Sequence, residues 1–157
     1  MIIKIVFGII LILISALIGY LLSERIRVRK QIFEKFIDFN REFMCDLSLY
    51  RETVVSRIEN ADATIGKTLE GAAEKLRLGQ YFSCRDQRLV FSEKKLVEDY
   101  VNSLGALDAF NQQEIMKMYD EKLKNVYLSL ETVYQKSAKL YTRLGFAVGL
   151  IVFIVII

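Results

Sequence analysis

The chain has 157 residues, no histidine, no proline and a formal net charge of +3, which fits one modest domain plus attachments. The absence of histidine removes the commonest general base and metal ligand, and the absence of proline leaves long helices uninterrupted. Residues 31–135 carry 14 basic and 18 acidic side chains, a net −4, whereas a nucleic-acid-binding domain would carry a basic stripe on this part of the chain.

The first segment of the chain is strongly apolar. Ile5–Leu22 is an 18-residue run in which Ser15 is the only polar interruption, about the length of a helix that crosses a lipid bilayer. A cleaved signal peptide is the alternative, but the run is long and no small-residue cleavage site closes it. We therefore predict a transmembrane helix over residues 1–22. A basic collar follows it directly: Arg25, Arg27, Arg29 and Lys30.

A long helix is predicted to continue out of this segment and to end near Asn60. Its apolar residues recur mostly every three, four or seven positions, which places them in one stripe on a helix. They are Ile26, Phe33, Phe36, Ile37, Phe43, Met44, Leu47, Tyr50, Val54 and Ile58. Asn40 falls on the same stripe, so it needs a hydrogen-bond partner if it is buried.

A second helix is predicted to begin at a cap on Asp62 or Thr64, to run to Leu78 and to end at Gly79. Within its first turn, "ADATIGKT" (61–68) resembles the phosphate-binding GxxxxGK[ST] loop. The first glycine of that motif is replaced by alanine, and a helix rather than a strand is predicted before it. We therefore favour a helix start with an exposed lysine over a nucleotide site.

Residues 79–91 lack periodicity and predict a connection, after which Ser92 is the expected cap of a short helix ending at Gly105. The last helix is predicted to start at Asp108 and to run into the apolar tail. Its expected seam is a near-heptad with one polar exception, Lys122. The seam comprises Ile115, Met118, Tyr119, Lys122, Val126, Leu130, Val133 and Tyr134.

The tail contains no polar side chain from Leu144 onward. Counted from Leu140 it offers 18 residues, and Arg143 can extend to the headgroups. A buried core helix is the alternative, but we predict a second transmembrane helix over residues 140–157.

The predicted fold is all-α. A cytoplasmic helical domain over 23–139 has long first and last helices that continue into the transmembrane segments 1–22 and 140–157. Basic residues lie on the inner flank of each segment, and the positive-inside rule then places residues 23–142 in the cytoplasm. The expected protein is two-pass, with membrane lipids among its partners.

No constellation of residues predicts catalysis. Cys45 and Cys84 lie far apart and form no CxxC motif, so neither a disulfide framework nor a zinc site is expected. The acidic pairs Glu98–Asp99 and Asp120–Glu121 are adjacent on helices, so their side chains diverge. We expect no enzyme, no cofactor, no metal, no small-molecule substrate and no nucleic-acid partner.

Three stretches resemble the stage III sporulation protein AB family: "SLGALDAFNQ" (103–112), "KLYTRLGFAVGL" (139–150) and "DLSLYRETV" (46–54). With the N-terminal segment and its basic collar, the resemblance covers essentially the whole chain. It is strongest from Ser92 onward and weakest over residues 61–91, where this chain is shorter than is usual for the family.

The resemblance implies a membrane protein of endospore-forming bacteria. It places the chain on the mother-cell side, in the outer forespore membrane, as part of a secretion-like complex that connects mother cell and forespore. The implied cytoplasmic domain looks like that of the type II secretion platform protein F. The implied partners are a cytoplasmic secretion-type ATPase and other stage III sporulation membrane proteins, and the family supplies no catalytic residues to transfer.

Within the first motif, structural roles are expected for the residues around a turn. Gly105 would end one helix in a left-handed conformation, and Asp108 would cap the next. Leu104 and Leu107 would pack beneath the turn.

Asn111 and Gln112 would bond to the loop or to a partner protein. In the second motif, Gly145 and Gly149 lie four residues apart and offer a small-residue face for helix packing in lipid. The alternative for these two glycines is that they merely occur in a lipid-facing helix.

Two functions stay open at this point. The first is a scaffold of the sporulation channel that couples the ATPase to membrane components. The alternative is a helical membrane sensor or regulatory adaptor unrelated to sporulation. A neighbouring gene for a secretion-type ATPase would favour the first, and one for a kinase or receptor would favour the second.

Overall fold

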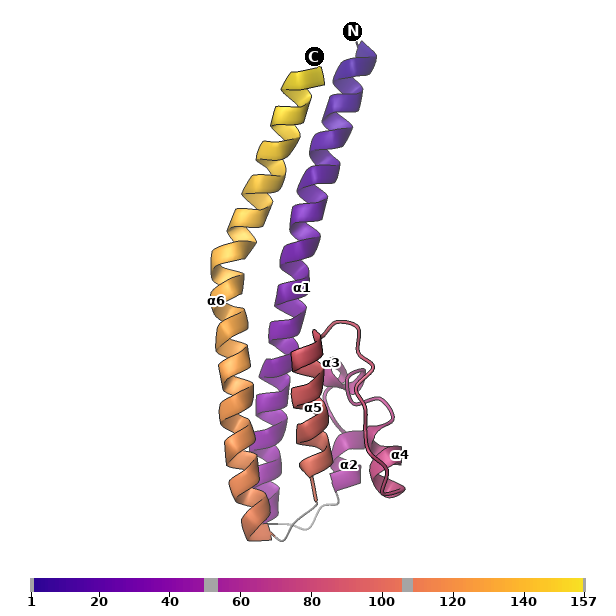
Figure 1. The fold of residues 1–157 in the computed structure, drawn as a ribbon, viewed down its shortest axis with the longest axis vertical. Coiled ribbons are helices and arrows are strands. Elements are labelled where there is room, and N and C mark those ends of the chain that lie inside the picture. Colours follow the sequence, from indigo (N-terminus) through magenta and orange to yellow (C-terminus); the bar gives the residue numbers. More distant parts are fainter. Residues whose placement is uncertain (1, 50–53, 106–108, 157) are drawn as a thin grey trace. The chain divides into compact units, whose positions relative to one another are not determined.

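A computed structural model of the chain describes residues 2–49, 54–105 and 109–156, and every regular element in these ranges is a helix (Figure 1). The all-α prediction is therefore confirmed for the described part of the chain. The helices are α1 (Ile2–Leu49), α2 (Val54–Glu59), α3 (Ala63–Gly66), α4 (Ala72–Arg77), α5 (Phe91–Ser103) and α6 (Ala109–Ile156).

The chain divides into two compact units. Residues 29–128 form one, here called the helical body, and residues 1–28 with 129–157 form the other, here called the terminal unit. Helices α1 and α6 each contribute residues to both units. The first membrane segment is predicted to end at residue 22 and the second to begin at residue 140. These limits depend on the position of the bilayer and stay predictions.

In the terminal unit many described apolar side chains are exposed, among them Leu13 (65% exposed) and Ile154 (73% exposed). Within the described residues, no helical stretch meets the combined length and apolarity required of a membrane span. The continuation of the long helices into transmembrane segments therefore stays a prediction.

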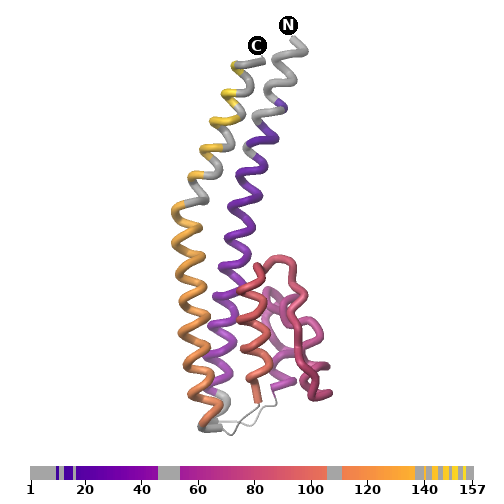
Figure 2. Tube along the Cα trace, in the orientation of Figure 1, coloured from indigo at the N-terminus to yellow at the C-terminus, as the bar shows by residue number. Residues whose placement is uncertain are grey.

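The core of the helical body is built on α1, and its course can be followed in Figure 2. The stripe predicted from the sequence is confirmed at Phe33, Phe36, Ile37 and Phe43, and the structure adds Ile32 and Phe39. The stripe is wider than predicted because α1 is covered on more than one side. Other elements contribute Ile58, Ile65, Leu69, Phe82, Leu89, Val97, Tyr100, Val101, Met116, Tyr119 and Leu123.

The prediction that the first helix continues to Asn60 is wrong. Helix α1 ends at Leu49, and α2 is a separate helix beyond residues 50–53, which lie outside the described ranges. The Nη2 of Arg57 lies 3.3 Å from Oε2 of Glu42. Fifteen residues along one helix would separate these positions by about 22 Å, so the ion pair requires the chain to fold back.

The second predicted helix is also divided. Its start is confirmed, since the Asp62 carboxylate accepts a hydrogen bond from the Thr64 N–H (2.7 Å) and caps α3. Gly71 then adopts a φ of 75°, which interrupts the helix before α4. The end is confirmed as well: Gly79 has a φ of 62°, and Gln80 N–H bonds back to Lys75 C=O, as in a Schellman motif.

Helix α5 starts earlier than expected. Its N-cap is Val90 rather than Ser92, because the side chain of Glu93 reaches back to the backbone N–H of Val90 (3.1 Å). The Ser92 prediction is therefore wrong by two residues.

The predicted seam of α6 is confirmed at Tyr119 and Leu130, but it is displaced by one residue at Met116 and Leu123, where Ile115 and Lys122 were predicted. The buried positions in the helical body are Gln112, Met116, Tyr119 and Leu123, with heptad spacings of four, three and four. Met118 is largely exposed, and Lys122 lies over the ring of Tyr119, 5.0 Å from its centroid. The displacement arises because Gln112 is buried although it is polar. A search for regularly spaced apolar residues does not count it as a seam position, so the register of the seam is misplaced.

Candidate functional site

Six of the eight predicted site residues lie in the turn between α5 and α6 or in the first residues of α6. The hydroxyl of Ser103 donates to the carbonyl of Tyr100 (2.6 Å) and closes the last turn of α5. Leu104 leaves the helix with extended backbone angles (φ −69°, ψ 124°) and is buried, as predicted. The φ of 72° at Gly105 confirms its left-handed conformation.

Two constraints act on Gly105. Its φ lies in the region that side chains other than glycine rarely adopt. A Cβ at this position would also lie 3.1 Å from Cγ2 of Val54 in α2. Gly105 is therefore packed closely against α2, and this second constraint had no signal in the sequence.

Gln112 bridges the two ends of the turn. Its side chain is buried, and its Nε2 donates to the carbonyl of Ser103 (3.0 Å). Its Oε1 has no hydrogen-bond partner in the structure, as far as the described residues extend. Asn111, the neighbouring residue, is exposed to solvent.

The remaining predicted site residues cannot be placed in contacts. Leu107 and Asp108 lie outside the described residues. Gly145 and Gly149 fall within α6, but their surroundings lie outside what the structure describes.

A buried polar network ties together three helices beneath the turn. Asn40 of α1 donates through Nδ2 to the carbonyl of Met116 in α6 (3.0 Å). The hydroxyl of Tyr100 in α5 donates to Oδ1 of Asn40 (3.3 Å). The partner that the sequence required for a buried Asn40 is thus supplied by two other helices, and the network fixes their mutual register.

Tyr100 is the centre of an aromatic cluster. Its ring meets those of Phe36, Phe39 and Tyr119 edge to face, with centroids 6.2, 6.5 and 5.4 Å away. Burial, and secondarily the charge of Asp120, raises the pKa of the Tyr100 hydroxyl. The hydroxyl therefore stays protonated and remains a hydrogen-bond donor to Asn40.

An ion pair fixes the start of α5 to α1. The Nε of Arg29 lies 3.2 and 3.0 Å from the two carboxylate oxygens of Glu93, and its Nη2 lies 2.5 Å from Oε1. The Glu93 side chain is buried, and that of Arg29 is largely so. Because the same carboxylate caps α5 at Val90, one group performs both tasks. The only sequence signal for this role of Glu93 was its position three residues after the N-cap.

The connection before α5 is ordered by a second polar cluster. The Asp86 carboxylate accepts hydrogen bonds from the Thr68 hydroxyl (2.7 Å) and from the Arg88 guanidinium (2.7 Å at Nη2). Burial opposes ionisation of Asp86, but the hydrogen bonds from Arg88 and Thr68 and the charge of Arg88 outweigh it and lower the pKa to about 2. The Asp86 side chain is 5% exposed, so this is a structural ion pair of the interior.

These contacts also involve the GKT-like stretch, residues 66–68, and they indicate a structural role for it. Thr68 is buried and its hydroxyl is engaged by Asp86, while Lys67 is exposed, as expected for a helix start. The stretch follows helix α2 and not a strand. The geometry therefore differs from that of a phosphate-binding loop, which follows a buried strand.

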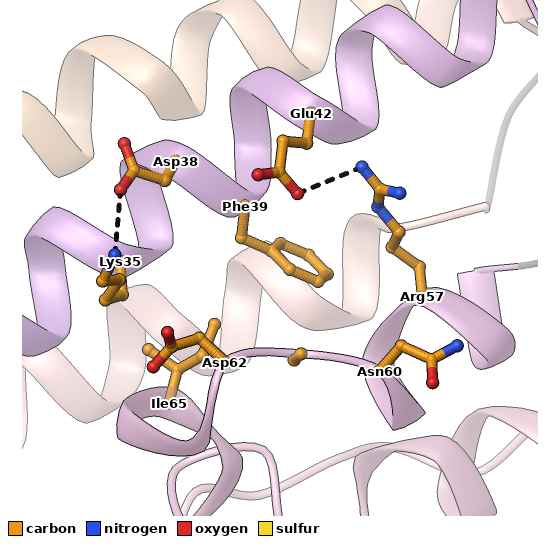
Figure 3. A pocket seen from close by; sticks show the side chains of 9 residues that line it. Lys35, Asp38, Phe39, Glu42, Arg57, Asn60, Asp62 and Ile65 are labelled. Carbon is orange, nitrogen blue, oxygen red and sulfur yellow. Dashed lines mark hydrogen bonds and ion pairs between the residues drawn. The ribbon is translucent and has the colours of Figure 1, made fainter.

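Figure 3 shows a cavity of about 160 Å³ between α1, α2 and α3. Its charged groups pair with one another, Lys35 with Asp38 (3.5 Å) and Arg57 with Glu42 (3.3 Å). A second, open groove of about 870 Å³ lies along α3, α4 and residues 81–86, with both acidic and basic side chains on its walls.

The free thiols differ in exposure. Cys84 is buried, its thiol faces the carbonyl of Thr68 at 3.8 Å, and burial raises its pKa. Cys45 is exposed. Over the described ranges, no three His, Cys, Asp or Glu side chains come together as metal ligands.

The comparisons with known proteins give one match. The model of the family described as stage III sporulation protein AB matches residues 4–157, nearly the whole chain. No curated protein and no solved structure matches. The match assigns the chain a role related to sporulation. The chain belongs to the stage III sporulation protein AB family.

Proposed function

We propose that this chain is a non-enzymatic, membrane-anchored scaffold of the channel complex between mother cell and forespore. The observation that carries the proposal is the family match over residues 4–157. The internal use of polar groups supports a structural role, because Asn40, Glu93 and Asp86 each bond to a distant segment of the helical body.

The membrane anchor rests on the terminal unit. The apolar run Ile5–Leu22 and the tail 140–157 supply it, and the exposed apolar side chains of α1 and α6 in this unit support it. Exposed apolar surface of this kind is costly in water and favourable in lipid. Gly145 and Gly149 are the proposed contact face between helices in the bilayer.

The basic residues beside both segments support a cytoplasmic position for the helical body. The family resemblance implies that this is the cytoplasm of the mother cell. The proposed site is the outer forespore membrane. There the body would act beside a secretion-type ATPase and other stage III membrane proteins, which are the partners that the family resemblance implies.

The turn between α5 and α6 is the proposed partner surface. Gly105 is left-handed at the end of α5, Gln112 at the start of α6 donates to the carbonyl of Ser103, and the exposed Asn111 is the neighbour of Gln112. A polar group on a helix start that is held by such a contact meets a partner at a low entropic cost.

Topology is the first test. Cys84 is buried and is a poor reporter, so the exposed Lys67 is replaced by cysteine in a Cys45→Ser background. A membrane-impermeant maleimide should label this Lys67→Cys variant only after the cells are permeabilised. Labelling in intact cells would place the helical body outside the cytoplasm and overturn the proposed orientation.

The partner surface is tested by Asn111→Arg, with Asn125→Arg as the matched control at another exposed position of α6. Co-purification of the tagged full chain from sporulating cells should lose the secretion-type ATPase for Asn111→Arg and keep it for Asn125→Arg. Equal recovery with both variants would remove the turn as the contact, and recovery of a kinase or receptor in place of the ATPase would favour a regulatory adaptor.

A further inference from the structure

The start of α5 carries the most exposed large apolar side chain described in the helical body. Phe91 is 84% exposed, and the adjacent Val90 is 44% exposed. Leu89, the residue before them, is buried, so the chain leaves the core at this point and presents two apolar side chains in succession. We call Val90 and Phe91 the apolar tip.

The apolar tip is held rigidly. The Val90 N–H is bonded to Glu93, and Glu93 is bonded in turn to Arg29 through three hydrogen bonds of 2.5 to 3.2 Å. Exposure of Phe91 is therefore a property of a fixed helix start. A mobile loop would instead be free to fold its apolar residues back onto the core.

The ion pair also locates the tip within the body. Arg29 is the first residue of the helical body, and near it Lys30 lies over the ring of Tyr127, one residue before the body ends. The tip thus lies at the end of the body at which the chain both enters and leaves it. That end is directly preceded in the sequence by the basic residues Arg25 and Arg27.

The acidic residues nearest the tip in the sequence form ion pairs within the body. The two acidic groups nearest in the sequence, Asp86 and Glu93, are neutralised internally by Arg88 and Arg29. The first charged residues after Glu93 are Lys94, which is half-buried, and Lys95, which is exposed, and the exposed Asp99 lies about two turns beyond the tip along α5. An apolar tip flanked by lysines has the chemistry of a peripheral contact with an anionic lipid surface.

We propose that Val90 and Phe91 insert into the headgroup region of an anionic bilayer, with Lys94 and Lys95 against the lipid phosphates. The contact would orient the helical body on the membrane that anchors it, so this inference rests on the proposed membrane attachment. A second copy of the chain is disfavoured as the occupant, because it would bring the lysines of two tips together.

The chain contains no tryptophan, so Phe91→Trp introduces a single fluorescent reporter at the tip. The matched control is Tyr81→Trp, at another exposed aromatic residue. Tyr81 lies beside the opposite end of α5, since the next residue, Phe82, donates its N–H to Asn102 (2.8 Å). Eleven residues of helix separate the two ends by about 16 Å, beyond contact with a bilayer that touches only the tip.

Both full-length variants are reconstituted into vesicles of phosphatidylglycerol and phosphatidylcholine with brominated acyl chains, and vesicle flotation is scored first. We expect a blue shift and strong bromine quenching for Phe91→Trp, and neither for Tyr81→Trp. Adding Lys94→Gln and Lys95→Gln should weaken the quenching of Phe91→Trp in anionic vesicles and leave it unchanged in vesicles of phosphatidylcholine alone.

The outcomes separate the two proposals. If Phe91→Trp floats with the vesicles but is not quenched, the lipid contact is overturned and the membrane anchor stands. A blue shift without quenching would show that protein, either the same chain or a second copy of it, covers the tip, and would overturn the lipid contact too. If the chain does not float at all, both the anchor and the contact fall.

Discussion

The helical body and the terminal unit differ in how far their large apolar side chains are exposed. On the single helix α1, Phe36 in the body is fully buried, whereas Leu13 in the terminal unit is mostly exposed. In the body the apolar residues follow a helical period, so other helices can cover them. In the terminal unit they form a continuous run that points to all sides, and two helical segments cannot cover such a run.

The two regions also differ in their polar contacts. The body contains buried polar groups that join distant parts of the chain, such as Asn40 with Met116 and Tyr100. In the described part of the terminal unit, the hydrogen bond between Gln135 and Glu131 and the ion pair between Arg27 and Glu24 are local contacts along one helix. The comparison teaches that the body is specified by tertiary contacts between distant parts of the chain, whereas these two contacts of the terminal unit are local.

The strongest test of the comparison is one truncation made in each region. Phe36→Ala should reduce the free energy of unfolding of the body by about 3–5 kcal/mol, because it opens a cavity in the aromatic cluster. Leu13→Ala should change it by less than about 0.5 kcal/mol, because the side chain is exposed.

Chemical unfolding of the full chain in detergent, followed by circular dichroism, measures both effects. Similar losses for the two variants would show that Leu13 belongs to a core and would remove the contrast between the regions.

The second test uses pH. Asp86→Asn should destabilise the body by about 2 kcal/mol at pH 7, because the folded-state pKa of about 2 lies below the ordinary value of 3.8. A depressed folded pKa stabilises the folded state above the unfolded pKa, and this contribution is lost as pH falls through the folded pKa. The difference between wild type and variant should therefore shrink from about pH 4 to about pH 2.

The matched control for Asp86→Asn is Asp38→Asn, which removes an exposed ion pair with Lys35 and should cost under about 1 kcal/mol. Unfolding free energies at several pH values measure both variants. A difference between wild type and Asp86→Asn that does not depend on pH would contradict the assigned role of the carboxylate.

The third test concerns the turn. Gly105→Ala should cost about 1–2 kcal/mol, since alanine is strained at a φ of 72° and its Cβ would lie 3.1 Å from Val54. Val54→Ala in the same chain should recover the steric part and leave the conformational part. Gly66→Ala, in α3 with open space around it, is the control and should be neutral or slightly stabilising. Equal melting temperatures for Gly105→Ala and wild type would contradict the turn geometry.

The smallest expected effect is that of removing the tail. Deletion of residues 144–157 removes no residue of the helical body, so the thermal melting of the body should be unchanged. The truncated chain should still associate with the membrane through Ile5–Leu22 but should assemble poorly in sporulating cells. A molten body after this deletion would place the tail in the core.

Several features of the body followed from local sequence. The spacing of Phe33, Phe36 and Ile37 predicted the buried face of α1, and the position of Asn40 on that face predicted a buried amide with a partner. The left-handed conformations of Gly79 and Gly105 followed from their places at helix ends. Each of these depends on a repeat or a backbone preference within a few residues.

Other features had no local signal. The seam of α6 was predicted one residue away from Met116 and Leu123, because the buried Gln112 interrupts the apolar pattern. Helix α1 was extended to Asn60 because an apolar repeat continues across the true break, and no proline or glycine marks it.

The sequence by itself determined the helical class, the uneven distribution of apolar residues between the ends and the middle of the chain, and the family. The tertiary structure decided which charges are paired and which apolar side chains stay exposed. Arg29 and Glu93 are 64 positions apart, and Asp86 meets Thr68 across 18. Pairings at such distances depend on how helices pack, and the periodicity of one helix contains no information about which side chain of another helix will face it.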